Sequence, residues 1–423
     1  MRPVPSAGTG LFPLDDELAL LPGTLTPRLQ ASLVRLGSWM PFAHAAREVG
    51  WLTRAVVSES VAERLTEAAG AAYVAEQTAE VERLEHRPPP EPVGPSLQQI
   101  SVDGAMISLV HKQWVEVKTL AIGTVVQEPN GDGRARELSY FSRRIDHTEF
   151  RRLALVETFR RGVGTALVVV AVMDGAGWLQ KFIDFHRPDA IRVLDFPHAV
   201  EYLARASHEA FGAGTAATSE WLGQQAHALK HDGPDPVLAT LRALPAGPFR
   251  DEALGYLEPR LAQLQYPTFR AAGYPIGSGI VEGANKVVVE DRLKGSGMHW
   301  APQSVDPMLA LRTIVCADRW EEAWPRISAR LRAEDHARRQ QRRQRCTERR
   351  AARTPALPVA APPTPDAAGA PDASPVVLVA PARLPTMPVP ASPPKRVVNG
   401  RPTKAHPWNR RFLPHLPPPP AET

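Results

Sequence analysis

Cysteine is almost absent from this 423-residue sequence, which contains only Cys316 and Cys346. Two cysteines so far apart exclude a disulfide framework within the chain and any zinc site made of cysteine ligands. The sequence also has no run of about 18 apolar residues, so we expect no membrane span. Its first ten residues, MRPVPSAGTG, lack the apolar centre of a signal peptide. Together these absences predict a cytoplasmic protein.

Proline and arginine are abundant, and both concentrate toward the C-terminus. The chain has 44 prolines and a formal net charge of only +5, but eight arginines and a single acid, Glu348, lie between positions 338 and 353. Such a run binds phosphates without sequence specificity. Residues 353–423 are rich in Pro, Ala and Val and have little periodicity, which predicts disorder. Residues 399–402 (NGRP) resemble the core of a minor-groove hook, although a solvated extension is the simpler interpretation.

The N-terminal part of the chain has helical periodicity. It predicts helices over residues 26–36, 42–50, 60–69 and 71–84. Ser60 and Glu63 have the spacing of a capping box at the start of the third helix. Three short helices with a turn in the middle fit a helix-turn-helix unit, and they also fit an ordinary helical bundle. The proline-rich segment 87–95 predicts a stiff linker, so we expect an N-terminal helical DNA-binding domain over 1–95.

Strands and helices alternate after the linker. Residues 98–126 predict two or three adjoining strands with a polar break at 111–113. Residues 166–173 (ALVVVAVM) form an unbroken apolar run that suits a strand buried on both faces. Shorter patterns predict strands at 136–143 and 191–195 and helices at 148–161, capped by Thr148, and 176–186. Strands followed by alternating helix and strand indicate a mixed α/β sheet.

The next segment, 199–265, is helical in pattern. A glycine-rich stretch, 274–286, then opens a helix that ends near Leu293, and further helices are expected at 305–316 and 320–332. We therefore predict an α/β domain over 96–335 with an all-α insertion at about 199–265. A basic, then proline-rich tail is expected over 336–423.

Three carboxylates stand within or at the ends of these predicted elements. Asp103 lies in the first strand, Asp174 follows the buried strand, and Glu282 lies on the glycine-introduced helix. Taken alone, Asp103 is equally consistent with an exposed Asp-Gly turn. Three hard oxygen ligands from distant positions suit Mg²⁺ or Mn²⁺, and two such ions would support phosphoryl transfer. An α/β sheet brings carboxylates together at strand ends.

The helix of Glu282 also carries basic residues. Asn285 and Lys286 follow Glu282 on the same face, and this strip could follow a phosphate backbone. The alternative is a solvated helix with an internal Glu282–Lys286 ion pair. Together with the arginine run, the predicted DNA-contacting residues are Asn285, Lys286, Arg292, Lys294, Arg338, Arg339, Arg342 and Arg343.

Several sequence blocks in order resemble insertion-sequence transposases of the Kra type, which are related to the Mutator-like transposases. The blocks are residues 12–18 (FPLDDEL), 101–106 (SVDGAM), 116–123 (EVKTLAIG), 174–176 (DGA), 186–190 (HRPDA), 194–198 (LDFPH), 277–286 (GSGIVEGANK) and 292–300 (RLKGSGMHW). The resemblance implies a ribonuclease-H-like core in which Asp103, Asp174 and Glu282 form a DDE catalytic triad. It also implies that the helical insertion accounts for the long separation of Asp174 and Glu282.

The resemblance carries further expectations about the site and its partners. Asp195 and His198 resemble an Asp-x-x-His element that helps to position the active site or DNA. The implied cofactor is Mg²⁺ or Mn²⁺, with two ions. The implied partners are the terminal inverted repeats of an element and target DNA, bound by a homodimer or larger assembly associated with the bacterial nucleoid. Two alternatives remain, namely a catalytically decayed or truncated transposase that only binds DNA and a different ribonuclease-H-like nuclease.

Overall fold

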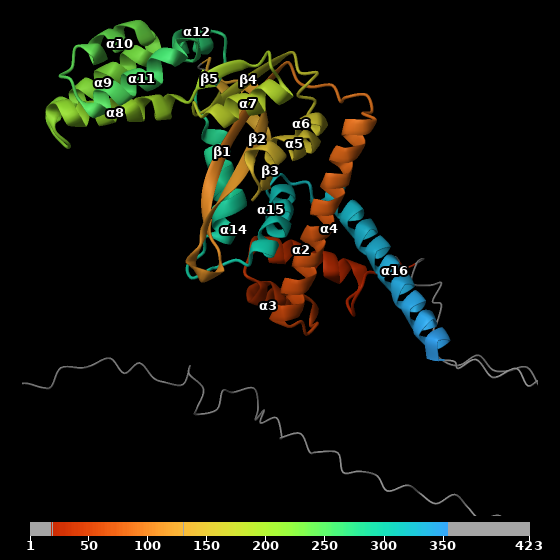
Figure 1. Cartoon of the computed structure of the whole chain (residues 1–423). Helices are drawn as coiled ribbons and strands as arrows, with labels where there is room; N and C mark the ends of the chain where they lie inside the picture. The colour runs from red at the N-terminus through yellow and green to blue at the C-terminus, as the bar shows by residue number, and fades with distance from the viewer. Residues whose placement is uncertain (1–17, 19, 130, 354–423) are drawn as a thin grey trace, which may run out of the picture. The chain divides into compact units, whose positions relative to one another are not determined.

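The computed structural model describes residues 18, 20–129 and 131–353. Its centre is a five-stranded mixed sheet with the strand order β3-β2-β1-β4-β5 (Figure 1). The first three strands are antiparallel, whereas β1, β4 and β5 run parallel to one another. The strands are β1 (Leu97–Ser108), β2 (Trp114–Gln127), β3 (Gly133–Arg143), β4 (Val168–Met173) and β5 (Ile191–Leu194). The predicted mixed α/β class is confirmed.

The two faces of the sheet follow from the alternation of side chains along β1. Ile100 and Val102 point into one apolar layer, where they meet the buried ring of Phe150. Ala105 and Ile107 point into the opposite layer, and Asp103 shares their face because successive side chains alternate. The predicted polar break corresponds to a one-turn 3₁₀ segment, η1 (Val110–Lys112), between β1 and β2.

Helices cover both faces of the sheet. The Ile100 face packs against short helices that follow the hairpin and the buried strand, namely α5 (His147–Leu153), α6 (Leu155–Arg160) and α7 (Gly177–His186). Asp146 caps α5 by accepting hydrogen bonds from the backbone N–H groups of Thr148 and Glu149, so the predicted cap Thr148 is wrong. The Ala105 face packs against α13 (Gly279–Ala284), the π-helical turn η3 (Asn285–Glu290), α14 (Asp291–Leu293) and α15 (Pro302–Cys316).

The predicted insertion is helical, as expected. It forms its own apolar core with β5 and the other face of β4, and Figure 1 shows its helices grouped beyond the β5 edge of the sheet. Its elements are α8 (Phe196–Phe211), α9 (Ala216–His231), α10 (Pro234–Arg242), α11 (Pro248–Leu257), η2 (Glu258–Gln263) and α12 (Tyr266–Ala271). The chain leaves the sheet for the insertion and returns from it at one place, because Phe196 N donates to the carbonyl of Ile276 at 3.0 Å.

The N-terminal helices share a hydrophobic core with the last two helices of the described chain. This core joins α2 (Pro27–Trp39), α3 (Phe42–Thr53) and α4 (Glu59–His86) to α15 and α16 (Trp320–Arg353). The N-terminal helices therefore pack into the same compact unit as the sheet. The helix-turn-helix interpretation of these helices stays a prediction.

One long helix, α4, replaces the two helices predicted at 60–69 and 71–84. Its cap is Ser58, whose hydroxyl accepts from Val61 N at 3.3 Å, so the predicted capping box at Ser60 is wrong. The helix continues through Gly70, where the lack of a side chain lets α15 approach. A Cβ atom on Gly70 would lie 2.2 Å from the carbonyl oxygen of Pro307.

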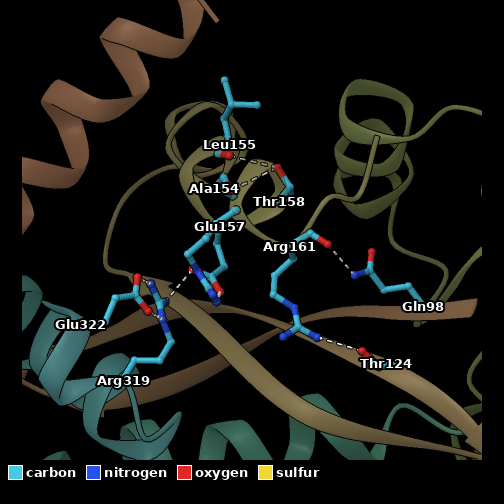
Figure 2. Close-up of polar contacts among 10 residues, drawn as sticks. Gln98, Thr124, Ala154, Leu155, Glu157, Thr158, Arg161, Arg319 and Glu322 are labelled. Carbon is cyan, nitrogen blue, oxygen red and sulfur yellow. Dashed lines mark hydrogen bonds and ion pairs between the residues drawn. The ribbon is translucent and has the colours of Figure 1, made fainter. Parts of the chain in front are cut away.

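A buried ionic cluster connects the short helix α6 to the start of α16 (Figure 2). Arg319 bridges Glu157, at 3.2 Å, and Glu322, at 2.7 Å. Burial alone would raise the pKa of Glu157, but the guanidinium groups of Arg160 and Arg319 outweigh it and lower that pKa. Removing one member of such a cluster leaves an uncompensated buried charge, so the cluster fixes this contact.

The predicted boundary between residues 335 and 336 lies inside α16, which continues to Arg353. The first part of the predicted tail is thus helical, with the arginine run on it. The predicted disordered segment beyond it, residues 354–423, lies outside the described residues. None of the helices in the described part is both long enough and apolar enough to cross a membrane.

We predict that Gly70→Ala lowers the free energy of unfolding by about 1–3 kcal/mol, because the added methyl group overpacks the contact between α4 and α15. Urea unfolding measures the change. Gly223→Ala in α9 is the matched control, since a Cβ there meets no atom within 4 Å. It should raise stability by up to about 1 kcal/mol. Equal behaviour of the two variants would contradict the close approach.

Candidate active site

Asp103 in β1 and Asp174, which directly follows β4, lie level with each other when the register of these two parallel strands is extended. Ile100 pairs with Ala171 in the register of β1 and β4, and each aspartate follows its partner in that pair by three residues. Both aspartates therefore project from the same face of the sheet, on strands about 4.8 Å apart. The two carboxylates that the sequence placed 71 positions apart are thus brought together by one strand pairing.

Glu282 lies on a helix that packs against the same face of the sheet. It lies on α13 with Asn285 one turn later, and Asn285 Nδ2 donates to Asp103 Oδ2 at 2.9 Å. The Glu282 carboxylate accepts from the hydroxyl of Ser278 at 3.1 Å. Asn285 is only 6% exposed, and its Oδ1 atom is buried without a hydrogen-bond partner. The helix therefore brings the Glu282 carboxylate and the Asn285 amide to the face of the sheet that carries Asp103.

The electrostatics of Asp103 show that the three carboxylates interact. Its pKa is raised first by burial and then by the charges of Asp174 and Glu282. The hydrogen bonds from Gly104 N, at 2.7 Å, and from Asn285 lower that pKa and offset only part of the rise. The site therefore concentrates negative charge in a half-buried position, which a cation would relieve.

Asp195 holds the Glu282 segment in place. This aspartate is 5% exposed, and its two carboxylate oxygens have separate partners. Oδ2 accepts from His198 N at 3.0 Å and so caps α8, while Oδ1 accepts from Ser278 N at 2.6 Å. Asp195 thus acts on the site by positioning the loop before Glu282.

His198 belongs to an aromatic cluster next to Asp174. Its ring packs edge-on against Tyr202 and Tyr256, which stack on each other with ring centroids 4.0 Å apart. The Tyr256 hydroxyl accepts from Gly175 N at 2.8 Å. Arg260 donates to the Gly175 carbonyl at 2.8 Å and lies 4.1 Å from the Tyr256 ring.

Tyr256 and Arg260 were missed by the sequence analysis. Both come from the helical insertion, which gave no motif there, yet they hold the residue that follows Asp174. A Cβ atom on Gly175 would lie 2.1 Å from Arg260 Nε, so a larger residue there would displace the Arg260 side chain. Burial raises the pKa of Tyr256 to about 12, which keeps its hydroxyl protonated.

The chemistry of the three carboxylates suits a divalent metal ion. Asp103, Asp174 and Glu282 are hard oxygen donors, as Mg²⁺ prefers, and the unpartnered Asn285 Oδ1 adds a neutral oxygen. As they stand, no three His, Cys, Asp or Glu side chains in residues 18, 20–129 and 131–353 converge as a metal-ligand group. Asp174 accepts instead from Ala176 N at 2.8 Å, and Glu282 accepts from Ser278. Binding would therefore require these two side chains to rotate.

The predicted DNA-contacting residues divide into exposed and buried ones. Lys286 and Lys294 are exposed on the helix of Glu282, and Lys294 pairs with Glu290 at 2.6 Å. Across the described chain no ion pair joins Lys286 to Glu282, so the alternative of an internal pair is wrong. The four arginines of the basic run that were predicted to contact DNA are exposed on α16, namely Arg338, Arg339, Arg342 and Arg343.

Two of the predicted DNA contacts require correction. Asn285 is buried and bound to Asp103, so it belongs to the carboxylate site. Arg292 is 2% exposed, donates to the carbonyl of Gly37 at 3.1 Å, and stacks on the rings of Phe42 and Trp300. Burial lowers the pKa of Arg292 to about 10. Helical spacing suggested an exposed strip, but the N-terminal helices cover this position.

A second buried arginine supports the π-helical turn after Glu282. Arg312 on α15 donates to the carbonyls of Val287 and Val288 in that turn and to Ser38 O, at 3.1 Å, in α2. A π-helical turn departs from the regular α-helical ladder and occurs often at functional sites. Arg312 therefore joins the N-terminal helices to the element that carries Asn285.

Comparison with protein-family models finds no match for this chain, and comparison with curated proteins finds none either.

We predict that Asp103→Asn stabilises the metal-free protein at neutral pH. A raised carboxyl pKa means that the folded state binds the proton more tightly than the unfolded state does. Wild-type stability therefore falls as the pH rises from about 4, the unfolded pKa, through the folded pKa. The neutral amide avoids this loss and can donate to Asn285 Oδ1 once the Asn285 amide is turned.

Urea unfolding in EDTA at several pH values tests this stability prediction. The advantage of Asp103→Asn should shrink as the pH approaches 4. Asp184→Asn is the control, because Asp184 is exposed and paired with Arg192 at 2.5 Å. It should change the free energy of unfolding by less than about 0.5 kcal/mol. A less stable Asp103→Asn variant at pH 7 would rule out the electrostatic account.

We predict that Tyr256→Phe destabilises the protein by about 1–3 kcal/mol, because it leaves Gly175 N without its acceptor. The control is Tyr202→Phe, whose hydroxyl makes no hydrogen bond within the described residues although its ring stacks on Tyr256. Denaturant unfolding of both variants separates the lost hydrogen bond from a change in stacking. Equal stability of the two variants would show that the Gly175 contact contributes nothing.

Proposed function

We propose that this protein is a DDE transposase of an insertion sequence, with a ribonuclease-H-like core that cleaves DNA strands and joins them to target DNA. The observation that supports the proposal is the placement of Asp103, Asp174 and Glu282 near one another by three separate elements, with the Asn285 amide bound to Asp103. Burial raises the pKa of Asp103 most, and the charges of Asp174 and Glu282 raise it further. This is the carboxylate set that the sequence resemblance implies.

Two features of the fold support the ribonuclease-H-like interpretation. The sheet combines an antiparallel meander with two parallel strands, and Asp103 lies in β1 while Asp174 directly follows the neighbouring strand β4. The helical insertion lies between β5 and the helix of Glu282, and its ends are held together by Asp195 and Ser278. A long insertion therefore separates Asp174 from Glu282 in sequence without separating them in space.

Each residue of the site has a distinct part in the proposed reaction. Asp103, Asp174 and Glu282 would hold Mg²⁺ or Mn²⁺, and bound ions of this kind activate a water or 3′-hydroxyl and stabilise the leaving oxygen. Asn285 orients the Asp103 carboxylate through its Nδ2 atom. Tyr256 and Arg260 fix the backbone beside Asp174, and Asp195 fixes the loop before Glu282.

The proposed partner is DNA, as element ends and as target. Lys286 and four arginines on α16, namely Arg338, Arg339, Arg342 and Arg343, are exposed cations that suit phosphate contacts. Both ends of an element must be brought together, so we propose a homodimer or larger assembly on DNA.

We predict that Asp103→Asn and Glu282→Gln each abolish Mg²⁺-dependent strand cleavage while DNA binding stays within about twofold of wild type. The substrate is duplex DNA carrying the inverted repeats that flank the gene, and cleaved strands are separated on denaturing gels. Asp184→Asn is again the control and should cleave normally. Wild-type cleavage by either carboxylate variant would exclude its assignment as a metal ligand.

The same experiment separates the alternatives. Binding to the repeats without cleavage in Mg²⁺ or Mn²⁺ would identify a DNA-binding protein that has lost catalysis. Cleavage of branched DNA regardless of end sequence, without strand joining, would identify a different nuclease.

A further inference from the structure

A cleft of about 640 Å³ lies beside the helix that carries Glu282. Strand β3, α9, α12 and the segment 274–287 form its walls. On α13, Gly279 and Gly283 line the cleft, whereas Glu282 is not among its lining residues. The cleft and the carboxylate site thus share one helix.

The charged lining of the cleft is predominantly basic. Arg134, Lys230 and Arg270 come from three different elements, and Asp132 is the acid among the lining residues. Asp132 pairs with Arg270 at 3.1 Å. Within the described residues neither Arg134 nor Lys230 forms an ion pair with a carboxylate. An anion entering the cleft would therefore meet two uncompensated cations.

The glycines in the wall have no explanation within the protein itself. A Cβ atom added to Gly277, Gly279 or Gly283 would meet no atom within 4 Å, so packing does not require glycine at these positions. None of the three has the positive φ that favours glycine. Glycine inside a helix also weakens it relative to alanine. The missing side chains therefore leave room for something outside the protein to approach the backbone.

The size and lining of the cleft indicate the ligand. Ligand pockets of about 300–1,000 Å³ hold molecules of small-molecule size, so this cleft fits a short piece of one strand and not a duplex. Leu138, Tyr140 and Ile280 supply an apolar wall for sugars and bases, and the cations suit phosphates.

We propose that the cleft binds a single DNA strand, with phosphates at Arg134 and Lys230 and the sugar-phosphate chain passing over Gly279 and Gly283. The proposal rests on the proposed function, since DNA is the expected substrate. The cleft holds a strand beside the Glu282 helix, away from the carboxylates, and so adds a second contact site for DNA.

The first test measures the salt dependence of binding. Full-length protein is titrated against a fluorescein-labelled single-stranded oligonucleotide in EDTA, and anisotropy gives the affinity at several salt concentrations. The double variant Arg134→Gln/Lys230→Gln should reduce the slope of log K against log salt by about 1.4, or about 0.7 for each lost phosphate contact. The matched control, Arg136→Gln/Lys181→Gln, removes the same charge outside the cleft and should leave the slope nearly unchanged.

The second test fills the cleft without changing its charge. Gly279→Ala/Gly283→Ala should weaken binding ~10-fold with no fall in Tm. Gly255→Ala in α11 is its control, because a Cβ there also meets no atom within 4 Å and the site is outside the cleft. Unchanged affinity of the glycine variant, an unchanged salt slope, or no binding of single strands by wild type would each overturn the proposal.

These outcomes are separate from those of the proposed function, because binding is measured in EDTA without catalysis. If the cleft variants bind single strands as tightly as wild type, and also cleave and join DNA normally, the cleft proposal is wrong and the transposase proposal stands. If wild-type protein binds single strands through the cleft but never cleaves DNA, the cleft proposal is supported and the catalytic proposal is wrong.

Discussion

The arrangement of the site depends on the buried carboxylate of Asp195. One of its oxygens caps α8 at the start of the insertion, and the other accepts from Ser278 N at the end of it. With the Phe196–Ile276 backbone hydrogen bond, this closes the helical insertion into a loop with adjacent ends. Because Glu282 follows Ser278 by one helical turn, its position above Asp103 is set by a residue that need not touch a metal.

Two buried arginines impose a second constraint from the opposite side. Arg292 and Arg312 donate to carbonyls at the end of α2, and Arg312 also holds the π-helical turn that follows Glu282. The N-terminal helices thus support the site directly. At its centre, Asp103 remains half-buried among like charges, a cost in the metal-free protein that a bound cation would offset. Stability and the proposed function are therefore in opposition at this residue.

Much of the fold could be predicted from local patterns. Alternation in 98–126 gave the β1–β2 hairpin, the apolar run 166–173 gave β4, and helical spacing gave the insertion. These signals are strong because burial of one face imposes a period on the sequence. The helix caps were less predictable. Ser58 and Asp146 form the caps, but the nearby Ser60 and Thr148 are also capping residue types. Separate helices at 60–69 and 71–84 were wrong because packing against Pro307 makes Gly70 favourable inside α4.

The sequence by itself placed Asp103 in a strand, Asp174 after a strand and Glu282 on a helix, and the resemblance selected these three among the 45 acids of the chain. Only the tertiary structure decided which polar residues surround them. Asn285 and Arg292 have the spacing of an exposed basic strip, but the sheet and the N-terminal helices bury them. Tyr256 and Arg260 carry no motif, yet they hold the backbone beside Asp174. Spacing along one helix fixes a face, whereas burial of that face depends on segments far away in the chain, which no local pattern records.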